Sequence, residues 1–166
     1  MSKHIKLLMQ IFLIISVIGL SSCRAKQQIG GNNIEVQKST VLELSYSEAE
    51  QQQPWGGVMT GVITDMNKEK APFEQYGFPK SVKETYNEEW FQTHSLIMII
   101  MATNSSYDYS VSSVKLSDIQ VGIVLNEIVP RASTDLKGYK AVLIEVPRDS
   151  GISGKKVTVD FKKKIK

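Results

Sequence analysis

Most of the chain after residue 34 alternates between short apolar runs and clusters of turn-forming residues. Apolar residues occupy every second position in 119–125 and in 157–161, which places them on one face of a strand. A continuous apolar run at 96–102 is typical of a buried strand. Strands are predicted at residues 41–46, 58–64, 95–103, 107–116, 119–130, 137–147 and 155–165. The pattern predicts a mainly β fold, either an antiparallel two-sheet sandwich or a half-open barrel.

Residues 86–94 break this pattern and predict the one short helix of the fold. Asn87 is suited to cap the helix, because its side-chain oxygen can accept a hydrogen bond from a free backbone N–H of the first turn. Glu88 and Glu89 suit the positive end of the helix dipole. We expect Trp90 and Phe91 to face the core.

Residues 65–81 are predicted to form a long loop, because the segment is charged and is interrupted by Pro72, Gly77 and Pro79. Loops of this length in a compact domain often carry function. This one also contains three aromatic residues, Phe73, Tyr76 and Phe78. Their side chains could pack down on the core, or they could present a surface to a partner.

The first 22 residues resemble a bacterial lipoprotein signal peptide. Lys3 and Lys6 precede an apolar stretch at 7–20, which is shorter than a membrane-spanning helix of about 20 apolar residues. The stretch leads into Leu20-Ser21-Ser22-Cys23, which resembles the lipobox, and Cys23 is the one cysteine among 166 residues. We expect cleavage between Ser22 and Cys23 and acylation of Cys23 with chains such as palmitate. The alternative is an ordinary secretory signal with an incidental cysteine.

An acylated Cys23 predicts that the mature protein lies in the cell envelope, on the outer face of the cytoplasmic membrane or at an outer membrane. Two acyl chains hold a protein stably on a bilayer, whereas one does so marginally. Residues 23–33 are polar and contain Gly30 and Gly31, so they predict a flexible tether. Residues 34–166 are predicted to form a single β-rich domain.

The charge of the chain is nearly balanced once the signal peptide is removed. The full sequence has 20 Lys and Arg against 17 Asp and Glu, and the signal peptide contains two of the lysines. Six lysines crowd the last twelve residues, where Asp160 is the one acidic residue. They could contact anionic lipid, at about 1 kcal/mol per lysine, or they could keep a strand end solvated. The near-neutral balance and the exported location argue against nucleic acid as a partner.

The mature chain offers little that could support catalysis, and we expect no cofactor and no metal. His94 is its one histidine, so a metal site built on several histidines is excluded. With Cys23 acylated, no thiol is left as a nucleophile. The Gly-x-Ser-x-Gly motif of hydrolases does not occur. The sequence therefore predicts a protein that is not an enzyme, with His94 in a structural role.

Residues 86–161 resemble the C-terminal domain of the protease complex subunit PrcB family. The likeness rests on Tyr86-Asn87-Glu88-Glu89-Trp90-Phe91, on the apolar strand at 95–100, and on the strands at 111–114, 123–130, 141–147 and 157–159. Two departures are Trp90, where the family usually has Phe, and the turn at 104–107, where it has Ser-Gly. The resemblance implies a noncatalytic accessory lipoprotein that accompanies a surface protease complex.

Two functions are consistent with these observations. The first is a membrane-anchored binding or assembly module for another exported protein, which docks through edge strands or the aromatic loop. The second is a small-ligand or glycan-binding lipoprotein with an aromatic groove. The candidate surface residues are Phe73, Tyr76, Phe78, Tyr107 and Tyr109, with Trp55 as a further groove residue. A flat, exposed apolar patch favours the first function, and an aromatic cleft with convergent polar groups favours the second.

Overall fold

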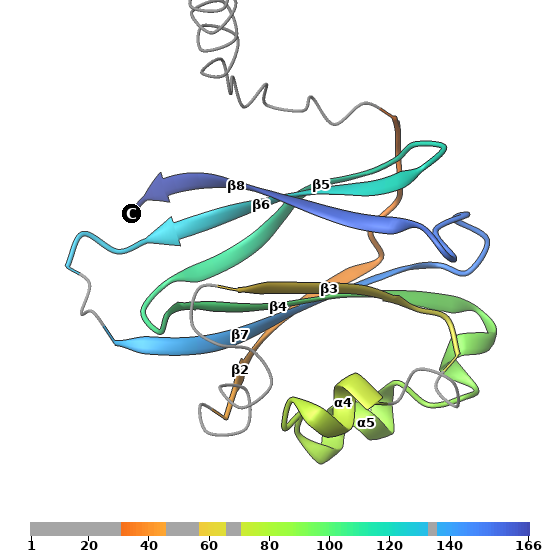
Figure 1. The fold of residues 1–166 in the computed structure, drawn as a ribbon, viewed down its shortest axis with the longest axis horizontal. Helices are drawn as coiled ribbons and strands as arrows, with labels where there is room; N and C mark the ends of the chain where they lie inside the picture. Colours follow the sequence, from red (N-terminus) through yellow and green to blue (C-terminus); the bar gives the residue numbers. More distant parts are fainter. Residues whose placement is uncertain (1–30, 46–56, 66–70, 133–135) are drawn as a thin grey trace, which may run out of the picture.

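Two four-stranded sheets face each other in the computed structural model, which describes residues 31–45, 57–65, 71–132 and 136–166 (Figure 1). The first sheet has the order β1-β5-β6-β8 and consists of Asn32–Asn33 (β1), Asp108–Leu116 (β5), Gln120–Val129 (β6) and Lys156–Ile165 (β8). The second has the order β2-β7-β4-β3 and consists of Lys38–Leu44 (β2), Val58–Ile63 (β3), His94–Asn104 (β4) and Lys137–Pro147 (β7). The predicted two-sheet, mainly β fold is confirmed, and the sheets do not close into a barrel.

Strand β4 lies at the centre of the second sheet and accounts for the longest apolar run of the domain. It pairs with β7 on one side and with β3 on the other. Residues 95–101 are all buried, because one face of the strand packs against the first sheet and the other lies under the helical segment. A strand buried on both faces needs apolar residues at successive positions rather than at alternate ones.

The first sheet is mixed, which the expectation of an antiparallel fold did not include. Strands β6 and β8 run parallel, with Gln120 opposite Lys156 and Val129 opposite Ile165. Between them the chain crosses to the second sheet, forms β7 and returns. A parallel pair requires such a crossover, and the alternation of apolar residues within a strand carries no information about its direction.

The apolar residues form two separate layers. One layer fills the space between the sheets and includes Ile99, Ile123 and Ile144, each fully buried. The other lies on the outer face of the second sheet, beneath Ala71–Gln75 (α4), Lys80–Thr85 (α5) and the 3-10 turn Trp90–Gln92 (η1). Figure 1 shows α4 and α5 on the side of this sheet that faces away from β5, β6 and β8.

Helices α4 and α5 lie where the sequence predicted a loop, and that prediction is wrong. The three residues taken as breakers instead mark helix ends. Pro72 falls in the first turn of α4, where a missing N–H costs nothing. Gly77 follows α4 with a φ of 63°, and Pro79 is the residue that precedes α5. Two short helices can therefore form within a segment rich in proline and glycine.

The helix predicted at 86–94 is reduced to the 3-10 turn η1. Asn87 has the capping contact that its sequence position indicated, because its Oδ1 accepts a hydrogen bond from the Trp90 N–H at 2.9 Å. Phe91 is buried, as expected, and Trp90 is half-buried. The turn ends at once because β4 begins at His94.

The domain begins earlier than predicted, since the last two tether residues form β1. Asn32 and Asn33 pair with Leu116 and Lys115 of β5. Gly31 precedes them with a φ of 131°, and a Cβ built at this position would lie 2.2 Å from the carbonyl oxygen of Leu116. Glycine is thus required at 31 by the close approach of β5. Residues 1–30, with Ser22 and Cys23, lie outside the described ranges.

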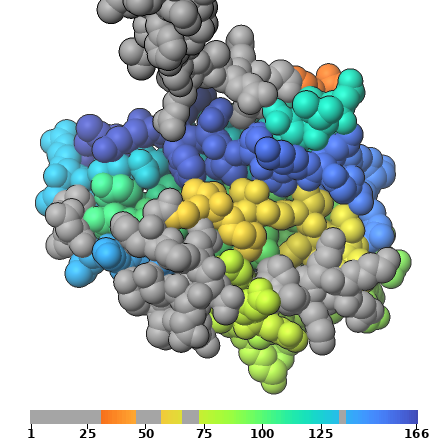
Figure 2. Space-filling view, in the orientation of Figure 1, coloured from red at the N-terminus to blue at the C-terminus, as the bar shows by residue number. Residues whose placement is uncertain are grey.

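Strands β3 and β8 are edge strands of different sheets and lie side by side across the molecule (Figure 2). Thr60 of β3 donates from Oγ1 to the carbonyl oxygen of Val157 on β8 at 3.3 Å. Along the described ranges, no helix has the length and hydropathy needed to cross a membrane.

Candidate functional site

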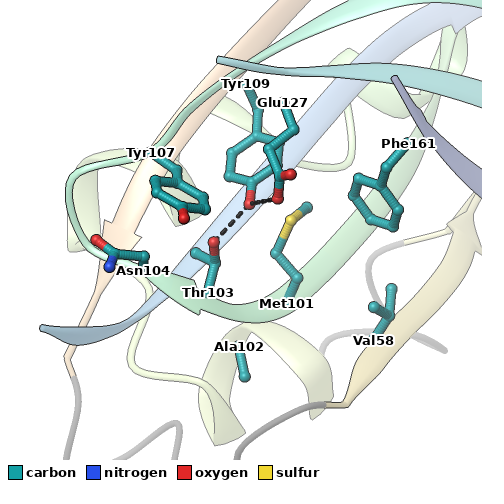
Figure 3. Close-up of a pocket in the computed structure, with 9 residues that line it drawn as sticks. All are labelled: Val58, Met101, Ala102, Thr103, Asn104, Tyr107, Tyr109, Glu127 and Phe161. Atoms are coloured by element: carbon teal, nitrogen blue, oxygen red, sulfur yellow. Dashed lines mark hydrogen bonds between the residues drawn. The ribbon is translucent and has the colours of Figure 1, made fainter. Parts of the chain in front are cut away.

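A cleft of about 390 Å³ opens where β4 ends and the chain turns into β5 (Figure 3). Both sheets contribute to it, and its walls come from five strands and the turn after β4. The lining residues are Val58, Met101, Ala102, Thr103, Asn104, Tyr107, Tyr109, Glu127 and Phe161. The cleft is therefore an open end of the interior between the sheets, and its floor is continuous with the core.

Polar residues reach this cleft from positions that face the interior. On β6, Val121, Ile123 and Leu125 point into the core, and Glu127 follows at the next inward-facing position. Thr103 holds the equivalent place on β4, two residues after Met101. The core thus ends in a threonine and a carboxylate rather than in further apolar side chains.

Tyr109 joins these two polar residues in a chain of hydrogen bonds. Its hydroxyl donates to Oε1 of Glu127 at 3.1 Å, and it lies 2.5 Å from Oγ1 of Thr103 (Figure 3). Because an ionised carboxylate can only accept, the tyrosine proton points to Glu127 and Thr103 donates to the tyrosine oxygen. The chain fixes one oxygen of Glu127 and the orientation of the carboxylate.

The Tyr109 hydroxyl stays neutral in this setting. Burial is the main cause that raises the pKa of Tyr109, and the negative charge of Glu127 raises it further. The hydrogen bond with Thr103 opposes this rise. Tyr109 therefore serves as a hydrogen-bond donor to Glu127 and not as an acid or a nucleophile near neutral pH.

Aromatic rings flank the carboxylate. The Tyr109 and Phe161 ring centroids are 6.2 Å apart in an edge-to-face arrangement. Phe161 is 40% exposed although it occupies an inward-facing position on β8, and Tyr107 is half-buried. Two rings are thus accessible to a ligand, with the buried Tyr109 ring behind them.

Other charged groups near the open end have ion-pair partners or are exposed to solvent. Lys140 of β7 lies opposite Met101, is almost fully buried, and pairs with Glu43 at 3.5 Å and with Asp108 at 4.0 Å. Lys163 of β8 lies opposite Glu127 in the parallel register and is exposed. Between described residues, Glu127 has the hydrogen bond from Tyr109 and no ion pair.

The structure divides the predicted surface residues between two places. Tyr107 and Tyr109 both line the cleft. Phe73, Tyr76 and Phe78 are 1%, 8% and 4% exposed and belong to the layer beneath the helices. The Phe73 and Phe78 rings are 5.1 Å apart, so these residues pack on the core and do not present a partner surface. Trp55 lies outside the described ranges.

Sequence reasoning selected two of the nine lining residues, Tyr107 and Tyr109, and missed the other seven, among them Thr103, Glu127 and Phe161. Glu127 carried a usable signal, because it is an acidic residue at the inward parity of an otherwise apolar alternation. Phe161 gave no such signal, since an aromatic residue on the inward face of a strand predicts core. Its exposure results from the position of β8 at the sheet edge.

His94 makes short-range contacts away from the cleft. Its Nδ1 lies 2.7 Å from Oγ1 of Thr93 and 3.2 Å from the carbonyl oxygen of Trp90, and its ring stacks on the Trp90 indole at 4.7 Å. In the ranges that the structure describes, no three His, Cys, Asp or Glu side chains gather as a metal site would require. The cleft presents one oriented carboxylate and accessible aromatic rings.

Comparison of this chain with known protein families, with curated proteins and with solved structures finds no match.

Proposed function

We propose that the protein is a noncatalytic binding module, held in the cell envelope by a lipid on Cys23, whose ligand enters the cleft around Glu127. The observation that carries the proposal is the convergence of aromatic rings and one oriented carboxylate in the same hollow. Ligand sites typically combine apolar and aromatic walls with a few fixed polar groups. Exposed rings that are not needed for the core are also a common mark of a recognition surface.

The cleft favours a ligand site over docking through a strand edge. Strand β8 is an edge strand, but Lys162, Lys163 and Lys164 follow one another along it. Lysines on an edge strand oppose pairing with another chain. The aromatic residues 73, 76 and 78, the other proposed docking surface, are buried. The resemblance to the PrcB family stays a prediction, and with it an exported protease complex as the source of the ligand.

Photo-crosslinking in the producing cells tests the binding site. A photoreactive phenylalanine would replace Tyr107 in the cleft, and a matched variant would carry it at Lys80 on α5, whose side chain is 88% exposed on the other side of the second sheet. We expect a defined adduct at position 107 that mass spectrometry detects and that position 80 lacks. Equal labelling at both positions, or none at 107, would show that the cleft binds nothing in the cell.

Intact-mass analysis of the native protein tests the anchor. We expect a chain that begins at Cys23 and carries diacylglycerol and fatty acyl mass, and we expect Cys23→Ala to remain unprocessed or to be released from the membrane. A native chain that begins at another residue, or that carries no lipid mass, contradicts the anchor and leaves the cleft proposal standing.

Turnover assays test the noncatalytic assignment. The purified protein would be incubated with casein, peptidoglycan and a panel of chromogenic esters, and no turnover is expected. Activity that survives repurification and disappears on substitution of His94 or of a single serine would make the protein an enzyme.

A further inference from the structure

A second glutamate, Glu145, has the same kind of tyrosine donor as Glu127 and also has an ion pair, which Glu127 lacks among the described residues. Glu145 of β7 accepts a hydrogen bond from the hydroxyl of Tyr86 at 3.0 Å, as Glu127 does from Tyr109. Glu145 also pairs with Lys38, its register partner on β2, at 3.5 Å. A carboxylate fixed by a tyrosine in this protein can thus be neutralised by the lysine opposite it.

The same register exists at Glu127, but the ion pair does not. Lys163 lies opposite Glu127 on β8, and parallel neighbours in register project to the same face. Within the described chain Lys163 forms no ion pair with Glu127, and the aromatic ring of Phe161 stands two residues before it on the same face. Lys140, which is buried at the open end of the sandwich, forms its ion pairs with Glu43 and Asp108. Among the described residues, no cation therefore pairs with the Glu127 carboxylate in the cleft.

The remaining walls of the cleft suit a positive group. Aromatic faces attract ammonium and guanidinium groups, and this attraction grows when the site is partly shielded from water. Met101 and Val58 supply an apolar floor beside the rings. One carboxylate, accessible rings and an apolar floor together match a cation carried on a short apolar stem.

A neutral sugar is a poorer match, because most polar atoms of the cleft are already used. The hydroxyls of Thr103 and Tyr109 bond each other, and the tyrosine proton goes to Glu127. Oδ1 of Asn104 accepts from the N–H of Ser106 at 2.9 Å and from its hydroxyl at 2.6 Å. A ligand with several hydroxyls would leave most of them unpaired, which costs binding free energy.

We propose that the cleft binds an organic cation, an ammonium or guanidinium group on an apolar stem, through Glu127 and the rings of Tyr107 and Phe161. This inference rests on the proposed function of the cleft and names its ligand class. The cation could be the end of a lysine or arginine side chain of an exported protein, or a free amine. Both present the same group to the same carboxylate.

Calorimetric titration of the full chain in detergent tests the ligand class with matched probes. Nα-acetyl-lysine amide and Nα-acetyl-arginine amide carry the cation, and Nα-acetyl-norleucine amide carries a similar stem without it. We expect the cationic probes to bind at least about tenfold more tightly than the neutral one, with dissociation constants on the order of millimolar. Equal binding of the neutral probe would overturn the inference.

Two variants assign the binding to Glu127. Glu127→Gln keeps the size of the side chain and should weaken the binding of the cationic probes roughly tenfold. Lys163→Gln removes the lysine opposite Glu127 in the strand register and should tighten their binding about twofold. Thermal unfolding of both variants confirms that they are folded. Unchanged binding in a folded Glu127→Gln variant would show that the carboxylate is not the recognition group.

A peptide and a free amine separate the two sources of the cation. A tetrapeptide with one internal lysine is compared with cadaverine on the same protein. Tighter binding of the peptide by about tenfold identifies an exported protein as the source, and equal or weaker binding identifies a free amine. Crosslinking at position 107 to an uncharged ligand would contradict the cation inference and leave the binding function intact, whereas an absence of crosslinks contradicts both.

Discussion

Two tyrosine–glutamate pairs, one on the helix-covered face of the second sheet and one between the two sheets, differ in whether a lysine pairs with the carboxylate. Tyr86 and Glu145 lie on the helix-covered face, and Tyr109 and Glu127 lie at the open end of the sandwich. The Tyr109 hydroxyl also has a hydrogen bond with Thr103 at 2.5 Å. Lys38 completes the first set at 3.5 Å from Glu145, and the hollow beside it is about 120 Å³. At Glu127 the hollow is about 390 Å³ and no described cation pairs with the carboxylate.

The hydrogen bond from tyrosine alone does not distinguish a structural glutamate from one that we propose binds a ligand. The distances from hydroxyl to carboxylate are nearly the same, 3.0 and 3.1 Å. What differs is the remaining surroundings of the carboxylate, which are protein at Glu145 and an open cleft at Glu127.

The two sites should differ most in the stability lost when an aromatic ring is removed, Tyr86 at the first site and Phe161 at the second. Tyr86 is 3% exposed and packs edge-to-face against Trp90 at 4.8 Å, so Tyr86→Ala should lower the free energy of unfolding by about 3–5 kcal/mol. Phe161→Ala should cost about 1 kcal/mol or less, because its ring is 40% exposed. Urea denaturation of both variants measures this. Equal losses would place Phe161 in the core and remove it from the cleft wall.

Removal of the tyrosine hydroxyl should also destabilise the protein more at Tyr86 than at Tyr109, but the difference in unfolding free energy should be smaller. Tyr86→Phe leaves the buried Glu145 without its donor and should cost about 1.5–3 kcal/mol, as expected for a hydrogen bond to a charged group. Tyr109→Phe should cost about 0.5–1.5 kcal/mol, since water in the cleft can replace the donor to Glu127. A double-mutant cycle with Glu→Gln at each site isolates the two interactions. A larger coupling at Tyr109 than at Tyr86 would reverse the assignment.

Alkaline pH should destabilise the protein through both tyrosines. Burial comes first among the causes that raise the pKa of Tyr86 and of Tyr109, and the neighbouring carboxylate adds to it. The folded state keeps these protons when the unfolded state has lost them, so their stabilisation is complete below about pH 10 and falls above it. Each tyrosine contributes a decline of up to about 1.4 kcal/mol per pH unit. Stability measured between pH 8 and 12 should therefore fall less steeply in either Tyr→Phe variant, and an unchanged slope would contradict the burial of that tyrosine.

Substitution of the lysine opposite each glutamate should give the smallest difference in stability between the two sites. Lys38→Gln breaks an ion pair whose lysine is 61% exposed, and it should lower stability by up to about 1 kcal/mol. Lys163→Gln should leave stability unchanged within about 0.5 kcal/mol, because no described ion pair is lost. Thermal melting resolves the two. A clear loss in Lys163→Gln would indicate that Lys163 neutralises Glu127 in solution.

The strands were predictable from sequence because each has a local signal. The apolar run at 96–102 and the alternation at 157–161 correspond to β4 and β8. Strand order was not predictable, since the parallel pairing of β6 with β8 depends on where β7 lies. The helices α4 and α5 were not predicted because proline normally interrupts a helix, whereas Pro72 and Pro79 stand where these two helices begin.

The cleft was partly predictable. Tyr107 and Tyr109 were among the aromatic residues expected to line a groove, and both line the cleft. Phe73, Tyr76 and Phe78 have the same residue types in a similar context, yet they cover the outer face of the second sheet. The outer face of the second sheet is apolar and must be covered from solvent. Composition alone does not reveal which aromatic residues cover it. The role of Glu127 was not predictable, because it depends on Thr103 and Tyr109, which lie on other strands and orient its carboxylate.

The strand order also constrains when this protein can fold. Strand β2 is completed by β7, roughly a hundred residues later in the chain, and β6 gains its second neighbour with the final strand, β8. Pairings between such distant segments form slowly, typically in milliseconds to seconds. A chain that is still emerging from a ribosome therefore lacks the strands that would close either sheet. Neither sheet is therefore complete before β7 and β8 have been synthesised, so a chain exported as we propose would cross the membrane before either sheet is complete.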